Sequence, residues 1–242
     1  MLKYQKPEMK VAIHQPNFMP YLGFFDKMGR ADIWIHYDDA QFVPRDFHHR
    51  NKIKTRNGSL WLTVPINKPP HFSPLPIREI TIRKSKIKRL EWQDYFLEQI
   101  KESYRKTPFF NDYFSKLKEI LENPEEKLCE FNIKIINFLR ECFNIRNQII
   151  FSSSLSKSNG IVSRSTQKII DLCKLVGADT YISGDGGRKY LDEELIRRAG
   201  ICLEYQEFHH PTYQQKNTKN FQKNLSAIDY LFNCDGTLPH DY

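Results

Sequence analysis

Residues 11–37 read VAIHQPNFMPYLGFFDKMGRADIWIHY. The runs at the two ends, residues 11–13 and 33–37, are β-branched and aromatic and have the character of strands. Between them, the apolar residues of the segment 21–31 recur at the spacing of a helix face. Strand, loop, short helix and strand in this order begin a βαβ unit, so the stretch predicts an α/β protein built on parallel strands.

The rest of the chain repeats this alternation on both sides of a helical middle. Further strands are predicted at residues 60–66, 77–82, 148–151, 179–183 and 201–205, and further helices at 165–176 and 191–199. The middle, residues 84–141, has apolar positions at helical steps and is punctuated by Pro108 and Pro124. We therefore expect a mostly parallel sheet flanked by helices, in a single α/β domain over residues 1–242, with residues 84–141 as a helical insert or subdomain.

The composition narrows the function classes. Hydrophobic residues make up 40% of the chain and aromatic residues 13%, which excludes a disordered polyelectrolyte. A net charge of +8 suits an anionic ligand, but the basic residues are dispersed, and the densest run, residues 83–89, opens a predicted helix that also carries acids. We expect no nucleic-acid partner.

No stretch reaches the roughly 18 apolar residues of a membrane span, and the first residues lack the apolar core of a signal peptide, so we expect a cytoplasmic protein.

The loop after the first strand is the first candidate site. It contains His14, Gln15 and Asn17, with Pro16 and Pro20 to stiffen it. In open parallel sheets, ligands bind beyond the carboxyl ends of strands, and a loop that enters a helix offers backbone N–H groups to an anion. A packed connection with a hydrogen-bonded core histidine explains the same residues, so both interpretations stay open.

The end of the second predicted strand carries the carboxylate pair Asp38 and Asp39, with Gln41 close behind as a candidate binding residue. Paired carboxylates at a strand terminus can bind Mg²⁺ or orient a general acid or base. They are equally ordinary as turn residues and helix caps. The pair is therefore consistent with Mg²⁺ binding or acid–base catalysis but does not require either role.

Residues 45–58 are strongly basic. The candidates for substrate binding in this segment are Arg45, His49, Arg50, Asn51 and Lys52. Basic groups gathered in one polar segment suit a phosphate or a carboxylate. A surface hairpin with Asn57-Gly58 as its tight turn also fits, and both can hold at once. The adjacent histidines resemble no strong metal motif, so no metal site is predicted.

Two later segments follow predicted strands. Residues 183–191 contain three glycines in four positions, and the candidates for phosphate binding there are Ser183, Gly184, Arg188 and Lys189. A simple helix-entry turn is the alternative. His209 and His210 follow the last predicted strand, and either is an acid–base candidate.

Motifs from all of these segments occur in one known family. In the first half they are His14-Gln-Pro, Pro20-Tyr-Leu-Gly23, Asp38-Asp39-Ala-Gln41, Arg50-Asn51-Lys52-Ile-Lys54 and Trp61-Leu-Thr-Val-Pro65; in the second half they are Gly177-Ala-Asp-Thr-Tyr-Ile-Ser-Gly184, His210-Pro and Asn224-Leu-Ser-Ala-Ile-Asp229. The chain thereby resembles the WbqC-like protein family. The resemblance implies a setting among bacterial O-antigen, lipopolysaccharide and other surface-polysaccharide genes, and hence sugar or nucleotide-sugar metabolism. It implies no particular reaction.

We therefore expect an enzyme that acts on a nucleotide-linked sugar, by acyl or aminoacyl transfer to an amino sugar. In this scheme His14 or His210 is the base, oriented by Asp38 or Asp39. The phosphates are held by Arg50, Lys52, Arg188 and Lys189. The expected co-substrate is acyl-coenzyme A or Mg·ATP. An early histidine and a late glycine loop are similar in layout to HUP-like nucleotidylyltransferases and ATP-dependent ligases, which gives one alternative; a non-catalytic sugar-nucleotide-binding protein is the other.

Overall fold

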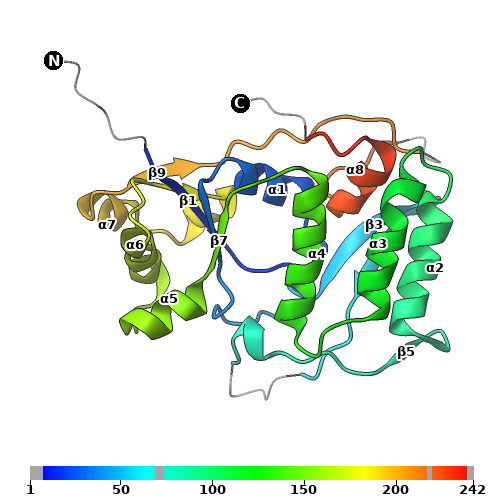
Figure 1. Ribbon diagram of the computed structural model, residues 1–242, viewed down its shortest axis with the longest axis horizontal. Helices are drawn as coiled ribbons and strands as arrows, with labels where there is room; N and C mark the ends of the chain where they lie inside the picture. Colours follow the sequence, from blue (N-terminus) through cyan, green and yellow to red (C-terminus); the bar gives the residue numbers. More distant parts are fainter. Residues whose placement is uncertain (1–7, 69–73, 217–219, 239–242) are drawn as a thin grey trace. The chain divides into compact units, whose positions relative to one another are not determined.

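The computed structural model describes residues 8–68, 74–216 and 220–238 (Figure 1). The chain folds into two compact units. Unit 1 consists of residues 1–14, 27–37 and 147–208, and unit 2 consists of residues 15–26, 38–146 and 209–242. The helix α1 (Leu22–Gly29) begins in unit 2 and ends in unit 1. Within the described residues, no helix is both long and apolar enough to cross a membrane.

Unit 1 is built on a five-stranded parallel sheet, which confirms the predicted fold class. Its strands are β1 (Lys10–His14), β2 (Ile33–His36), β7 (Gln148–Phe151), β8 (Thr180–Ser183) and β9 (Cys202–Tyr205), in the order β7-β2-β1-β8-β9. Every residue of β2 and of β8 is buried. Parallel strands that are covered on both faces are buried in this way, and β2 and β8 accordingly carry aromatic and β-branched side chains.

The two faces of this sheet differ in character. Val11, Ile13, Ile33 and Ile35 lie on one face and pack in one apolar cluster with residues of α6 (Ser165–Leu175) and α7 (Glu193–Arg198). Because side chains alternate along a strand, His14, Trp34 and His36 lie on the opposite face. The valine and isoleucine side chains of β1 and β2 therefore face the helices α6 and α7, and the two imidazoles lie on the opposite face of the sheet.

Unit 2 is mainly helical, with a two-stranded antiparallel hairpin. Its helices are α2 (Trp92–Tyr104), α3 (Phe110–Glu122), α4 (Leu128–Cys142) and α8 (Ala227–Asn233), and its hairpin is β3 (Arg50–Thr55) with β4 (Gly58–Thr63) (Figure 1). Phe18, Trp92, Phe96 and Phe131 form the centre of its core, with ring centroids 5.2–6.0 Å apart. Aromatic pairs at such distances contribute about 0.5–1.5 kcal/mol each beyond the burial of their area.

Most predicted elements are confirmed, and two are wrong. The predicted strand 77–82 is replaced by the 3-10 turn η1 (Ile77–Glu79) and by isolated bridges at Thr81 and Ile82. Ile77 and Ile80 are both buried, whereas a strand would send two residues three apart to opposite faces. Residues 83–89 open no helix but lead into the short hairpin of β5 (Lys86–Ile87) and β6 (Leu90–Glu91). At its turn, Lys88 and Arg89 have left-handed backbones that a right-handed helix excludes.

Three short elements carry too little apolar periodicity to be predicted. These are α5 (Ser152–Asn159), the 3-10 turn η2 (Asp185–Lys189) and α8. The β3–β4 hairpin is present, but its turn lies one residue earlier than expected, since Thr55 pairs with Gly58 and leaves Arg56 and Asn57 as the turn residues. The expectation of a single domain with residues 84–141 as an insert stays a prediction.

Candidate functional site

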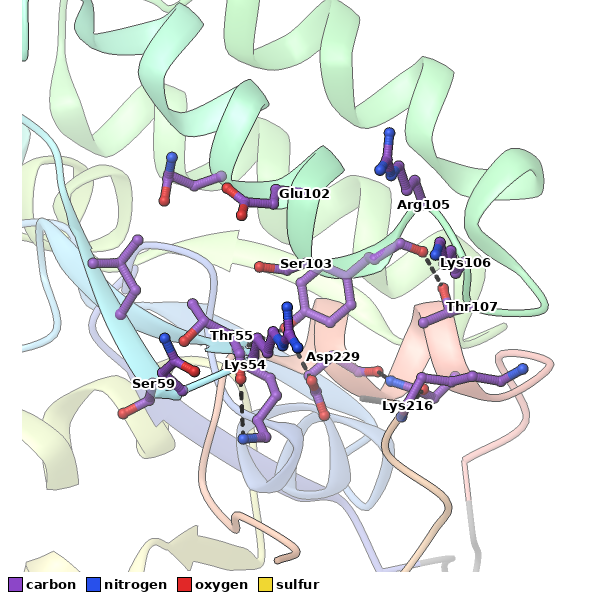
Figure 2. Close-up of a pocket in the computed structure, with 16 residues that line it drawn as sticks. Lys54, Thr55, Ser59, Glu102, Ser103, Arg105, Lys106, Thr107, Lys216 and Asp229 are labelled. Carbon is purple, nitrogen blue, oxygen red and sulfur yellow. Dashed lines mark hydrogen bonds between the residues drawn. The ribbon is translucent and has the colours of Figure 1, made fainter. Parts of the chain in front are cut away.

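Unit 2 contains a polar cavity of about 740 Å³ (Figure 2). Figure 2 shows side chains from the β3–β4 hairpin, from α2 and the loop after it, and from the C-terminal part of the chain converging on this space. The cationic residues that line it are Lys54, Arg56, Arg105, Lys106 and Lys216, against the acidic residues Glu102 and Asp229. Five cations against two carboxylates make the cavity attractive to an anion.

The remaining lining residues are almost all hydrogen-bonding groups. Five carry hydroxyl groups and three carry amides, and Leu60 is the single aliphatic side chain among the described lining residues. Most ligand pockets are mainly apolar with a few polar groups. A cavity lined by hydroxyls, amides and cations instead suits a ligand that is itself polar over most of its surface, such as a phosphorylated sugar.

A buried hydrogen-bond network fixes the floor of the cavity. The carboxylate of Asp229 is inaccessible to solvent and accepts bonds from the hydroxyl of Tyr104 at 2.9 Å, the hydroxyl of Tyr213 at 2.6 Å and Nε2 of Gln215 at 2.8 Å. The Tyr104 hydroxyl in turn accepts from the backbone N–H of Lys54 at 2.8 Å. Burial raises the pKa of Asp229 above its ordinary value, while the three donors oppose this shift. The network therefore ties α8 to α2 and to strand β3.

Lys54 closes the hairpin turn at the edge of the cavity. Its side chain is 5% exposed, and Nζ donates to the carbonyls of Thr55 at 3.1 Å and Gly58 at 3.2 Å. An ammonium has three N–H donors, so two backbone bonds leave one donor for a ligand. The basic segment predicted from sequence thus reaches the cavity through Lys54 and Arg56, which belong to that segment but are not among its five candidate residues.

The five candidates of that segment lie elsewhere, and none of them lines the cavity. Arg50 and Lys52 lie over the ring of Trp61, with their charged groups 4.4 Å and 4.9 Å from its centroid. Asn51 is buried and donates from Nδ2 to the carbonyl of Met19 at 2.7 Å. Arg45 is exposed, and its carbonyl accepts a bond from Arg50.

His49 is held in the neutral state. Burial lowers its pKa to about 4, with smaller contributions from the charges of Arg50 and His48. It also packs against Phe42, with ring centroids 5.5 Å apart. A neutral, partly buried imidazole of this kind supports the loop and is poorly suited to binding an anion.

The candidates of the loop after β1 are divided between the units. Gln15 belongs to unit 2, where its Oε1 lies 3.2 Å from Nε2 of His48. His48 accepts the backbone N–H of Val43 on Nδ1, so Nε2 carries the proton and donates to Gln15. Asn17 is half-buried, and its Oδ1 is shielded from solvent and accepts no hydrogen bond within the described residues.

In unit 1, His14 belongs to a cluster at the carboxyl ends of β1 and β2. Its ring stacks on Trp34 with centroids 6.0 Å apart and an interplanar angle of 9°. Trp34 donates from Nε1 to Nδ1 of His36 at 3.3 Å, which places the proton of that imidazole on Nε2. The carboxyl ends of parallel strands are where ligands bind in open α/β sheets.

Lys27 is the residue of this cluster that sequence reasoning missed. It is 3% exposed, its Nζ donates to the carbonyl of Ile13 at 3.3 Å, and it lies 5.5 Å from the ring centroid of Trp34. Burial lowers its pKa to about 7, so the amine is largely uncharged in mildly alkaline solution. A Cβ at Gly184 would lie 3.9 Å from Nζ, so the amine faces the loop after β8. The feature of the sequence that could have identified Lys27 is its position within the apolar run of a short helix.

The loop after β8 is held by its own side chains. Arg188 pairs with Asp185 at 3.0 Å and lies 3.8 Å over the ring of Tyr205, and Lys189 is exposed. Gly187 is required by space, because a Cβ there would lie 2.2 Å from Oγ of Ser183. The amine of Lys27 thus faces Gly184, whereas Oγ of Ser183 lies against Gly187 and the guanidinium of Arg188 is already engaged.

The remaining candidates lie in unit 2. His210 is half-buried beside Tyr213, with ring centroids 6.2 Å apart, and its Nδ1 lies 2.8 Å from the carbonyl of Pro211. A carbonyl only accepts, so Nδ1 carries the proton and Nε2 is the unprotonated nitrogen that can act as a base. Asp38 is buried, Asp39 is half-buried and Gln41 is exposed, and none of the three lines the cavity. Among the described residues, no group of three metal-ligating side chains occurs.

The chain is thus an α/β protein of two units: one is built on a parallel sheet, and the other contains a cation-lined cavity. The chain belongs to the WbqC-like protein family, whose model matches residues 15–238. It is also 28% identical to "Uncharacterized protein Rv1507c" of Mycobacterium tuberculosis over 234 residues, which covers 96% of each chain. No solved structure matches the chain.

Proposed function

We propose that this protein is an enzyme of bacterial surface-polysaccharide biosynthesis that binds a nucleotide-linked amino sugar and transfers an acyl or aminoacyl group to it. The observation that carries the proposal is the cavity of unit 2, with its five cations, two carboxylates and eight hydroxyl or amide side chains. A diphosphate is recognised by Lys and Arg, and sugar hydroxyls by amides and hydroxyls. The setting in polysaccharide genes comes from the family resemblance.

The size and shape of the site support a small ligand. A volume of about 740 Å³ lies within the range of roughly 300–1,000 Å³ that is typical of small-molecule pockets. Recognition of a nucleic-acid strand instead uses an extended positive groove with aromatic platforms. Among the described residues that line the cavity, Tyr104 is the one with an aromatic ring, and its hydroxyl is already engaged with Asp229.

The proposed chemistry needs a base for the amine of the sugar. As the amine nitrogen bonds to the carbonyl carbon of the acyl donor, it loses a proton, and the bond to the leaving group breaks. His210 fits this role because its tautomer leaves Nε2 unprotonated, and burial lowers its pKa and keeps it neutral. Its neighbour Tyr213 bonds to Asp229 in the cavity floor. His14 of unit 1 is the second candidate base.

Binding is tested by calorimetric titration with UDP- and dTDP-linked amino sugars. Arg105→Ala and Lys106→Ala should each weaken binding about tenfold or more, because a charge-assisted hydrogen bond contributes about 1.5–3 kcal/mol. Lys101→Ala is the matched control, since Lys101 is an exposed cation of helix α2, just before these two residues, and does not line the cavity. Equal affinities for all three variants would exclude the cavity as the site.

Catalysis is tested separately with acyl-coenzyme A or Mg·ATP as the second substrate. His210→Ala or His14→Ala should reduce turnover by about 10²-fold at whichever residue is the base. Near-normal turnover in both would remove the assignment. Release of pyrophosphate that requires Mg²⁺ would instead indicate nucleotidyl transfer or ligation, and ligand binding without any product would indicate a sugar-nucleotide-binding protein.

A further inference from the structure

An aromatic and basic surface lies on unit 2, away from the residues that line the cavity. It consists of Val43, Arg45, Phe47, Arg50, Lys52 and Trp61, which we call the aromatic–cation patch. Three of these are among the most exposed large apolar residues described: Val43 is 44%, Phe47 45% and Trp61 38% exposed. None of the six lines the cavity. Exposed apolar side chains that gather in one place mark interaction sites more often than scattered ones do.

The patch is held together by specific contacts. Phe47 and Trp61 lie with ring centroids 6.0 Å apart. Lys52 is the direct cross-strand partner of Trp61 in the hairpin, and both it and Arg50 hold their charges over the indole ring. Val43 and Phe47 project from the loop that precedes β3, where the backbone N–H of Asp46 donates to the Val43 carbonyl. Asp46 is the acidic residue within residues 40–63, against three cations of the patch.

We propose that the aromatic–cation patch binds the surface of an anionic phospholipid bilayer. Bilayer interfaces favour exposed Trp and Phe side chains, whose rings enter the headgroup region, together with Lys and Arg that pair with anionic lipid. The patch provides both kinds of group side by side. Its aromatic and aliphatic side chains supply the apolar contact, and the three cations supply the charge complementarity.

The geometry favours a bilayer over a single-stranded nucleic acid. A nucleobase needs an open aromatic face on which to stack. Arg50 and Lys52 already lie over the Trp61 ring, so two cations compete with a stacking base for this ring, and Phe47 adds exposed apolar surface beside it. An interfacial ring needs only to bury its edge and body among headgroups, with its cations still free to meet phosphates.

The tryptophans make a direct test possible. The chain has three, of which Trp34 is 0% and Trp92 is 1% exposed, so Trp61 alone can reach a lipid. The full chain is mixed with vesicles of phosphatidylcholine and phosphatidylglycerol whose acyl chains are brominated, and tryptophan emission is recorded. Quenching is expected with these vesicles, and it should be weaker with pure phosphatidylcholine and at high salt. Trp61→Phe should abolish it while Trp34 and Trp92 keep their emission.

Vesicle flotation with matched variants completes the test. Lys52→Gln should lower the partition coefficient about fivefold, the effect expected for one cation near an anionic surface, and Lys101→Gln should leave it unchanged. Phe47→Ser should lower it about tenfold, and Val162→Ser, which changes an exposed apolar residue of unit 1, should not. Unquenched Trp61 emission, or equal flotation of Phe47→Ser and Val162→Ser, would overturn the proposal. A shift of Trp61 emission by a single-stranded oligonucleotide but not by vesicles would replace it with nucleic-acid binding.

Discussion

Replacing Lys27 with methionine should stabilise the protein, and the gain should depend on pH. Lys27 is 3% exposed, and its Nζ has a backbone carbonyl as acceptor at 3.3 Å. Burial lowers its pKa from 10.5 to about 7. At about 1.4 kcal/mol per unit, keeping this amine charged in the folded protein costs about 5 kcal/mol. Methionine has a similar length and no charge, so Lys27→Met removes this cost.

The sign of the pH dependence follows from proton binding. Between pH 7 and 10.5 the unfolded chain holds a proton on Lys27 that the folded chain has released, so the free energy of unfolding of the wild type rises with pH. Below pH 7 both states are protonated, and the full cost applies. The advantage of Lys27→Met should therefore be largest at pH 6 and should shrink by about 1.4 kcal/mol for each pH unit above 7.

The measurement is urea unfolding of both proteins at several pH values from 6 to 9.5. Lys157→Met is the matched control, because Lys157 is an exposed lysine of α5 in the same unit. Its effect should not change with pH over this range. If the stability difference between wild type and Lys27→Met were equally flat, Lys27 would keep an ordinary pKa in the folded protein, and the reasoning from burial would be refuted.

Three further predictions concern buried polar groups. Tyr104→Phe leaves the Lys54 N–H without its acceptor and should lower the free energy of unfolding by about 1–3 kcal/mol, measured in urea. Asn132→Leu removes donors to two backbone carbonyls at 2.7 Å and 2.8 Å and should cost at least as much, whereas an exposed control, Asn111→Leu, should be near neutral. His49 should show no titration by NMR between pH 5.5 and 8, because its pKa is about 4; a midpoint near 6.5 would contradict its burial.

Local pattern was enough to predict most of the fold. Residues 11–37 contain the strand, helix and strand that the structure shows as β1, α1 and β2, because alternation and helical spacing are properties of neighbouring residues. The pattern failed where burial in unit 2 decided instead. The sequence around Ile77 and Ile80 predicts a strand. In the structure both side chains are buried, and residues 77–79 form a 3-10 turn.

The candidate residues show the same division. The sequence shows that residues 45–58 are basic, but the cations of this segment that line the cavity are Lys54 and Arg56, while Arg50 and Lys52 lie over Trp61. The contact that each side chain of the hairpin makes is set by the tertiary structure, and the order of residues along the chain does not show it. Lys27 was not a candidate site residue from sequence, and its burial distinguishes it from a surface lysine.

The linear order of residues thus determined the α/β class, the parallel strands and the family, since each depends on spacing along the chain. The cavity depends on Lys54, Arg105 and Asp229, which are brought together by the packing of β3, α2 and α8. The lowered pKa of Lys27 depends on the burial that removes its amine from water. Both are consequences of burial among groups distant in sequence, and burial is set only when the chain is folded.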